Sequence, residues 1–145
     1  MFISLISQIY KNTGEEKLSD FEELKKKSNE WREWYYDGAP KPPEVAKSTE
    51  EAFELINATL FGHIYQRPKL DGKIRSLCTI AALIVLDKPN QLPGHITGAL
   101  NYGWSKEEIV ELITQMLFYG GYPTAVNSLA AAAKTFAEYD ERHNK

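Results

Sequence analysis

Residues 77–86 read LCTIAALIVL, and this stretch decides the fold. It carries one polar residue, Thr79, and no charged side chain. The run lies inside a helix that we expect over about residues 71–86, because DKPN at 87–90 ends the apolar pattern. A helix that is apolar on nearly every side is buried all round. We therefore expect this helix either at the centre of its domain or against another subunit.

The segments around this helix share a signal that starts helices, a serine followed three residues later by a glutamate. In this signal the hydroxyl accepts a hydrogen bond from a backbone N–H of the first turn, and the glutamate reaches back to the cap. It occurs at Ser19–Glu22, Ser48–Glu51 and Ser105–Glu108, and helical periodicity follows each occurrence. These features predict an all-α fold of about six helices.

Periodicity and breaking residues set the expected bounds of the helices. We expect a short amphipathic helix within residues 1–18 and a stiff connector at GAPKPP (38–43), because its three prolines lack backbone N–H donors. The remaining helices are expected at about 20–36, 49–65, 71–86, 92–102, 106–119 and 124–139.

Length and composition limit the class of protein. A chain of 145 residues with 43% hydrophobic and 26% charged residues fits one globular domain, expected to span 1–145. The net charge of −3, without a block of like charges, argues against a nucleic-acid partner. No uncharged apolar stretch approaches the length of a membrane span, so we expect no membrane partner.

The first residues and the cysteine content indicate the compartment. The stretch MFISLISQIY (1–10) lacks both a basic start and a small-residue cleavage site, which argues against a signal peptide. The single cysteine, Cys78, cannot form an intramolecular disulfide. A chain of this kind suits a reducing compartment, and we expect a cytoplasmic protein.

His95 is the first candidate for chemistry. It lies in LPGHITGAL (92–100), in the first turn of the helix that we expect from Leu92. The partial positive charge at a helix N-terminus disfavours imidazolium, so we expect the side chain to be neutral near pH 7. A neutral histidine can accept a proton or donate from its N–H. The spacing also fits a histidine that only satisfies a polar contact in the first turn.

Other candidates lie around the turn PKLDGKI (68–74). Arg67 and Arg75 flank this turn. Each is either an ordinary charge at a helix end or a residue that binds a substrate carboxylate through two N–H groups of its guanidinium. Ser76 is either part of a site or a helix residue that bonds its own backbone. Cys78 lies in the apolar run, where a thiolate is disfavoured, so a structural thiol is favoured over a nucleophile.

Several other kinds of site are disfavoured by the sequence. No two histidines have the spacing of a metal site, and no second cysteine is present, so we expect no metal. The sequence contains no glycine-rich phosphate loop and no Gly-x-Ser-x-Gly elbow.

Five motifs occur in order between residues 61 and 136. They are Tyr65-Gln66-Arg67-Pro68-Lys69-Leu70-Asp71, Arg75-Ser76, His95-x-x-x-Ala99-Leu100-Asn101-x-Gly103, Ser105-x-Glu107-Glu108-Ile109 and Tyr119-x-Gly121-x-Pro123. In their order and separations they resemble the carboxymuconolactone decarboxylase family, on the branch of the γ-carboxymuconolactone decarboxylases. This resemblance covers about half of the chain and leaves residues 1–60 as a helical N-terminal extension.

The resemblance implies an all-helical bundle of the alkylhydroperoxidase D-like type, whose subunits assemble as trimers or hexamers. Such an assembly would account for a helix that is apolar all round. Another branch of the same superfamily carries Cys-x-x-Cys-x-x-x-His with a glutamate further upstream, a redox pair with a proton relay. The two cysteine positions are Lys88 and Gln91 here, and the glutamate position is Ser76. The missing dithiol disfavours peroxidase chemistry by that route.

The resemblance also implies a reaction. It is the decarboxylation, without a cofactor, of an unsaturated lactone carboxylate such as γ-carboxymuconolactone, or of a related carboxylic acid. The residues implied to be catalytic are His95, Arg75 and Ser76, with His95 as the acid or base and the arginine as a carboxylate binder. The residues expected to bind the substrate are Arg67, Tyr65, His63 and Tyr119. His63 is not a histidine of the family pattern, and it indicates a different substrate.

Two alternatives stay open beside the decarboxylase. One is an antioxidant hydroperoxide reductase of the peroxiredoxin kind that uses Cys78 alone. The other is an oligomeric ligand-binding protein that has kept the fold without catalysis. The deciding feature is whether His95 and the two arginines converge on one site, within the chain or across a subunit boundary.

Overall fold

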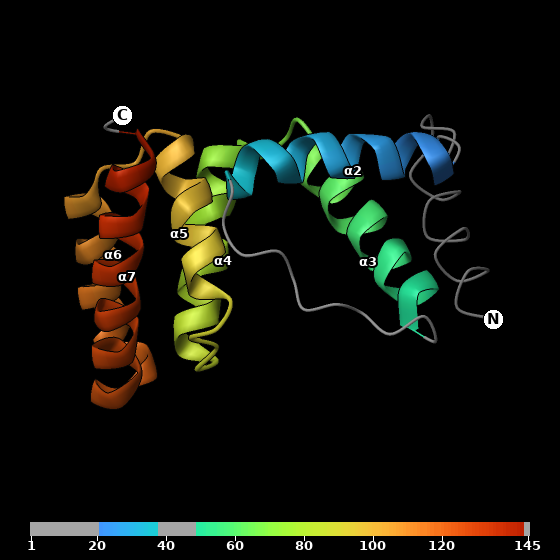
Figure 1. The fold of residues 1–145 in the computed structure, drawn as a ribbon. Helices are drawn as coiled ribbons and strands as arrows, with labels where there is room; N and C mark the ends of the chain where they lie inside the picture. The colour runs from blue at the N-terminus through green and yellow to red at the C-terminus, as the bar shows by residue number, and fades with distance from the viewer. Residues whose placement is uncertain (1–20, 38–48, 144–145) are drawn as a thin grey trace.

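The computed structural model describes residues 21–37 and 49–143. Within these ranges the chain forms six α-helices, one short 3-10 helix and no strand (Figure 1). The elements are α2 (Phe21–Tyr36), α3 (Glu50–Gly62), η2 (Ile64–Gln66), α4 (Gly72–Val85), α5 (Leu92–Asn101), α6 (Lys106–Gly120) and α7 (Tyr122–His143). The all-α prediction is confirmed. The helix expected within 1–18, the signals at Ser19 and Ser48 and the connector at 38–43 lie outside the described residues.

Most helices lie close to their expected bounds because local signals decide where they begin. Ser105 caps α6 as predicted: its Oγ accepts from the Glu108 N–H at 3.1 Å, and the Glu108 carboxylate accepts from the Ser105 N–H at 2.8 Å. α7 begins earlier than expected, at Tyr122. The reason is that a helix tolerates Pro123 in its first turn, where the missing N–H is not needed.

The helix expected over 49–65 is divided in the structure. α3 ends at Gly62, and η2 follows after His63. In η2 the N–H of Gln66 donates to the carbonyl of His63 at 3.1 Å, the tighter bonding of a 3-10 turn. The chain tightens here because Pro68 disfavours helical geometry in the residue before it.

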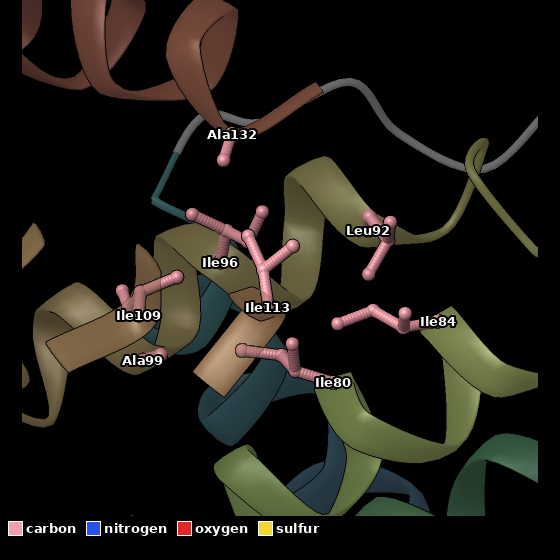
Figure 2. Packing of buried hydrophobic residues seen from close by; sticks show 8 residues of the cluster. All are labelled: Ile80, Ile84, Leu92, Ile96, Ala99, Ile109, Ile113 and Ala132. Carbon is pink, nitrogen blue, oxygen red and sulfur yellow. The ribbon is translucent and has the colours of Figure 1, made fainter. Parts of the chain in front are cut away.

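The hydrophobic core lies among α4, α5, α6 and α7. Figure 2 shows Ile80 and Ile84 reaching from α4 toward Ile113 of α6. The buried cluster consists of Ile80, Ile84, Leu92, Ile96, Ala99, Ile109, Ile113 and Ala132. Its members come from helices that are consecutive in the chain, so the bundle is built by short loops between neighbouring helices.

The helix that contains the apolar run, α4, is not buried all round within one chain. Ile80 and Ile84 are fully buried, but Val85 is 42% and Leu86 63% exposed, and Ile74 on the same helix is 44% exposed. Among the described residues, the neighbouring helices cover one face of α4 only. These helices therefore do not bury α4 all round, and burial against another subunit stays a prediction.

α2 and α3 lie beside the bundle, and the C-terminal end of α2 reaches α5 (Figure 1). The two helices approach closely because α3 ends in a glycine. A Cβ on Gly62 would overlap with the backbone carbonyl of Leu24 in α2. The hydroxyl of the buried Ser28 donates to the carbonyl of Asn57 at 2.9 Å, a second bond between these helices.

The C-terminal end of α2 is held by side chains from the bundle. The amide nitrogen of Asn101 donates to the carbonyl oxygen of Trp34 at 2.9 Å and to that of Tyr35 at 3.2 Å. These carbonyls need such a donor because the last carbonyls of a helix have no N–H partner within it. The hydroxyl of Tyr139 in α7 donates to Oδ1 of Asn101 at 3.0 Å and so orients the amide. Asn101, one of the motif residues, therefore fixes α2 to α5 and α7.

A second contact at this end involves Asp37 and the C-terminal turn of α7. His143 places Nε2 3.1 Å from Oδ2 of Asp37, and its ring stacks on Tyr139 with centroids 4.0 Å apart. The sequence places this histidine in a charged tail, which suggests full solvation. The side chain is exposed, as this predicts, and it also contacts Asp37 at the junction between α2 and α7.

Candidate active site

His95 lies near the start of α5, which begins at Leu92 with Pro93 in its first turn. The hydroxyl of Tyr35 lies 3.2 Å from Nδ1 of His95 and 3.4 Å from the His95 carbonyl oxygen. Tyr35 belongs to α2, and its side chain is fully buried. Two helices far apart in the sequence therefore build one polar contact in an apolar setting.

Aromatic side chains surround this contact. We use the name aromatic cluster for Trp31, Tyr35, Tyr36, Phe61 and Tyr65. Within the cluster, Trp31 stacks on Tyr35 with centroids 4.2 Å apart and on Phe61 at 5.0 Å. Tyr35 and Tyr36 meet the His95 ring edge to face, with centroids 5.6 Å and 5.8 Å away. Four of the five side chains come from helices α2 and α3, so these helices supply most of the surroundings of His95.

Tyr35 reaches its position because α5 carries a glycine beneath it. A Cβ on Gly98 would overlap with the ring of Tyr35. Trp31 stacks against the same ring, so the phenol cannot move aside without losing that contact. Gly98 is therefore required for the close approach of the ring to α5.

Burial sets the protonation state of this site. Desolvation lowers the pKa of His95 to about 4. It also raises the pKa of Tyr36 to about 12 and moves that of Tyr35 further in the same direction. All three side chains are therefore neutral near pH 7. The neutral histidine expected from the sequence agrees with this, but its cause is burial rather than the dipole of the helix.

The lowered pKa of His95 predicts a pH-dependent stability. An unfolded histidine titrates near pH 6.5 and the folded one near pH 4, so the unfolded chain binds more protons between these values. The contribution of neutral His95 to the free energy of unfolding is complete above pH 6.5 and is lost as the pH falls toward 4. Urea unfolding should show a loss of about 2 kcal/mol from this group between pH 7 and pH 5.

The matched control for this prediction is His95→Gln, which cannot titrate. The other histidines and the carboxylates are common to both proteins, so the difference between the two unfolding curves isolates His95. An equal loss of stability in both proteins would contradict the buried neutral imidazole.

The arginines predicted from the sequence lie at the turn before α4. Arg75 donates from Nε to the carbonyl of Leu70 at 3.1 Å and from Nη2 to the carbonyl of Arg67 at 3.3 Å. The side chain of Arg67 is exposed. Among the described residues neither arginine forms an ion pair. Arg75 therefore stabilises the turn, and no contact joins either guanidinium to His95.

Ser76 is fully buried, and its hydroxyl donates to the carbonyl of Lys73 at 2.6 Å. This is the backbone bonding that the sequence allows for a serine in a helix. Cys78, expected as a buried structural thiol, is exposed on α4 within the described chain. The physical reason is that it lies on the face of α4 that no other described helix covers.

The three remaining predicted residues lie in different surroundings. Tyr65 belongs to the aromatic cluster, packs on Trp31 at 4.8 Å, and bonds the hydroxyl of Thr79 at 2.5 Å. His63 lies at the C-terminal cap of α3, one residue before η2. Tyr119 is 70% exposed near the end of α6, and no described ring contact joins it to the aromatic cluster. The structure thus brings Tyr65 close to the surroundings of His95 and leaves Tyr119 apart.

Sequence reasoning missed the contribution of α2. Tyr35 and Tyr36 follow Trp31 by four and five residues, about one helical turn further along α2. The density of aromatic residues in NEWREWYY (29–36) is the signal that marks this helix. Its placement over His95 depends on contacts across about 60 residues of chain, which no local pattern contains.

Across 21–37 and 49–143, no group of three or more histidine, cysteine, aspartate and glutamate side chains is arranged to hold a metal ion. None of the described helices combines the length and apolar character needed to cross a membrane.

Comparison with known proteins gives a consistent result. The carboxymuconolactone decarboxylase family matches residues 50–134. The chain is 32% identical over 84 residues to the 4-carboxymuconolactone decarboxylase of Acinetobacter baylyi, covering 58% of this chain and 63% of that protein. It is 34% identical over 87 residues to the nitrosuccinic acid decarboxylase of Metarhizium robertsii, covering 60% and 61%. A 15.0 kDa protein of Paracoccus denitrificans is 42% identical over 84 residues, covering 56% and 62%.

These matches span less than two thirds of the length of each relative. The segment that matches the family includes His95 and its helix, whereas α2, which supplies Tyr35, precedes that segment. The family match extends over more than half of the chain and contains all the motifs singled out in the sequence. The chain therefore belongs to the carboxymuconolactone decarboxylase family.

Proposed function

We propose that this protein is a decarboxylase that acts on an unsaturated lactone carboxylate, such as γ-carboxymuconolactone, or on a related carboxylic acid. The observation that carries the proposal is the neutral, partly buried His95, whose Nδ1 lies 3.2 Å from the Tyr35 hydroxyl beside the aromatic cluster. Two relatives that carry the name decarboxylase support it.

The proposed reaction needs no cofactor in principle. The substrate carboxylate leaves as CO2, and the electrons of the broken C–C bond delocalise into a conjugated carbonyl to form an enolate. One proton from solvent then replaces the CO2 on carbon. The protein has to stabilise the oxyanion of the enolate, and a preorganised donor in a desolvated site does this more strongly than water.

His95 fits the role of that donor. When the Tyr35 hydroxyl donates to Nδ1, the ring proton is on Nε2, and Nε2 makes no hydrogen bond with the described residues. A neutral imidazole N–H can then donate to the developing oxyanion and relay the proton to carbon. The lowered pKa of His95 means that this donor is the N–H of a neutral imidazole near pH 7.

The other predicted residues have weaker support. Arg75 and Arg67 remain proposed carboxylate binders on the ground of the family resemblance, although Arg75 already donates to two carbonyls of the turn. A catalytic part for Ser76 rests on the same ground, since its hydroxyl is bonded to the helix backbone. Substrate contacts of Tyr65, His63 and Tyr119 likewise stay proposals.

The proposal is tested by measuring CO2 release from a panel of lactone carboxylates and of nitro- or keto-substituted acids. We expect turnover of at least one acid whose carboxylate is conjugated, through the bond that breaks, to a carbonyl or nitro group. Peroxide reduction that is lost on Cys78→Ser, without CO2 release from any acid, would favour the hydroperoxide reductase instead. Binding without either reaction would favour a non-catalytic ligand-binding protein.

We also propose that the protein is a homo-oligomer, a trimer or a hexamer. Large apolar side chains lie uncovered on three helices of the bundle. They are Ile74 and Val85 on α4, Leu86 at its C-terminal cap, Val110, Phe118 and Tyr119 on α6, and Tyr122, Val126 and Leu129 on α7. Covering this much apolar surface is the usual reason for subunit association.

Sedimentation equilibrium should therefore give three or six times the chain mass of 16.5 kDa. The double variant Val85→Lys with Leu86→Lys should shift the mass toward the monomer, because it places two charges on the uncovered face of α4. Lys134→Gln, on an exposed part of α7, is the control and should leave the mass unchanged. A wild-type monomer would contradict the proposal.

A further inference from the structure

Arg32 in α2 lies beside the aromatic cluster and has no assigned role. It is spaced three and four residues from Tyr35 and Tyr36, so the three side chains share one side of the helix. The centre of its guanidinium lies 5.8 Å from the ring centroid of Phe53 and 5.8 Å from that of Phe61. The side chain is half-buried between α2 and α3.

The guanidinium has no partner in the described chain. Its Nε atom is buried and makes no hydrogen bond, and no carboxylate of the described residues forms an ion pair with it. By contrast, Lys25 on the same helix pairs with Glu54 at 2.9 Å. A half-buried arginine usually has an anionic partner, because desolvating an unpaired charge is costly.

The contacts with the two phenylalanines do not satisfy this arginine. The five N–H donors of a guanidinium lie in its plane, and a ring accepts no conventional hydrogen bond from them. The rings of Phe53 and Phe61 therefore lie near the cation and leave its donors for a planar acceptor. A carboxylate matches this fork in shape and charge.

Tyr36 links the arginine to His95. Its ring lies 5.8 Å from the His95 ring and 6.1 Å from Phe61, and Phe61 contacts the guanidinium. Burial raises the pKa of Tyr36, and the charge of Arg32 opposes that rise, so the guanidinium is within electrostatic reach of the phenol. The unpaired cation and the neutral histidine thus border two aromatic rings, Phe61 and Tyr36, that contact each other.

We propose that Arg32 binds the carboxylate of the substrate that stays on the product. This inference rests on the proposed decarboxylation, which defines the substrate and the product. The leaving carboxylate is an unsuitable partner, because it loses its charge on becoming CO2, and pairing it with an arginine would stabilise the ground state more than the transition state. A retained carboxylate keeps its charge throughout and can be held without this penalty.

The test measures binding without turnover. Isothermal titration calorimetry at pH 7 compares the dicarboxylates succinate and glutarate with the monocarboxylates butyrate and valerate. We expect the wild-type protein to bind a dicarboxylate at least about tenfold more tightly than the monocarboxylate of equal length. Arg32→Met keeps an apolar stem between the phenylalanines and should weaken dicarboxylate binding by roughly tenfold to hundredfold, removing that preference.

Two further variants make the test specific. Lys26→Gln removes one positive charge from the exposed side of α2 and should change dicarboxylate affinity less than about twofold, because surface charges contribute little. Arg32→Lys keeps the charge but loses the fork, and should weaken dicarboxylate binding by several fold while retaining some preference. It serves as the deciding variant if circular dichroism shows that Arg32→Met does not fold.

Three results would overturn the proposal. They are a wild-type protein that does not prefer dicarboxylates, an unchanged affinity in the folded Arg32 variants, or an equal loss of dicarboxylate affinity in Lys26→Gln.

Failure of the proposed function gives a different pattern. A protein that releases no CO2 from any acid, yet loses succinate binding on Arg32→Met, would refute the decarboxylase and retain the carboxylate site.

Discussion

Replacing His95 with alanine is expected to lower the turnover of the preferred acid by about 10²- to 10⁴-fold, the usual contribution of a positioned acid or base. Because the donor acts on charge that develops in the transition state, kcat and kcat/KM should fall together while substrate binding changes little. The measurement is steady-state CO2 release over a range of substrate concentrations. Circular dichroism and sedimentation establish that the variant keeps its fold and assembly.

Tyr35→Phe is the companion variant, since it removes only the hydroxyl that lies 3.2 Å from Nδ1. Its ring stays stacked on Trp31, so the packing around His95 is preserved. We expect a smaller loss of kcat than in His95→Ala, because the imidazole remains but its tautomer is no longer selected. Wild-type turnover by a folded His95→Ala protein would remove this histidine from the mechanism.

The largest structural effect is expected from Gly98→Ala. Helix propensity alone would make this change stabilising by up to about 1 kcal/mol. The structure predicts the opposite sign, because the added methyl overlaps with the Tyr35 ring, which is fully buried and stacked on Trp31. Overpacking of this kind costs about 3 kcal/mol, and the free energy of unfolding in urea should fall accordingly.

The variant should also impair function, since displacing Tyr35 breaks its contact with His95 and loosens α2. A double-mutant cycle with Tyr35→Leu separates steric overlap from other causes. In that smaller background Gly98→Ala should cost little or become favourable, because the methyl then occupies the space of the ring. An equal cost in both backgrounds would show that α2 does not pack on α5 in this way.

The helices were predictable from the sequence because their signals are local. The cap at Ser105 and the periodicity of each apolar stripe act within a few residues of the positions that they control. The exceptions are also local in origin: Pro68 follows a tightened turn at His63, and Pro123 is accepted in a first turn. The family followed from the order and separation of short motifs, which the match to residues 50–134 confirms.

The environment of the candidate site was less predictable. Histidine at position 95 and tyrosine at position 65 were identified from the sequence, but the arginines were chosen from their position beside a turn. The structure shows Arg75 bonded to carbonyls of that turn, while the unpartnered guanidinium belongs to Arg32 on another helix. An arginine in a charged amphipathic helix gives no local sign that aromatic rings from α3 will enclose it.

By itself, the sequence determined that this chain is helical, where most helices begin and end, and which family it belongs to, because capping, periodicity and motif spacing act over short distances. Only the tertiary structure decided that His95 is neutral through burial, that Tyr35 is its partner and that Gly98 makes room for that partner. The reason is physical. Desolvation and ring packing depend on helices separated by about 60 residues of chain, and their effect exists only once α2 lies against α5.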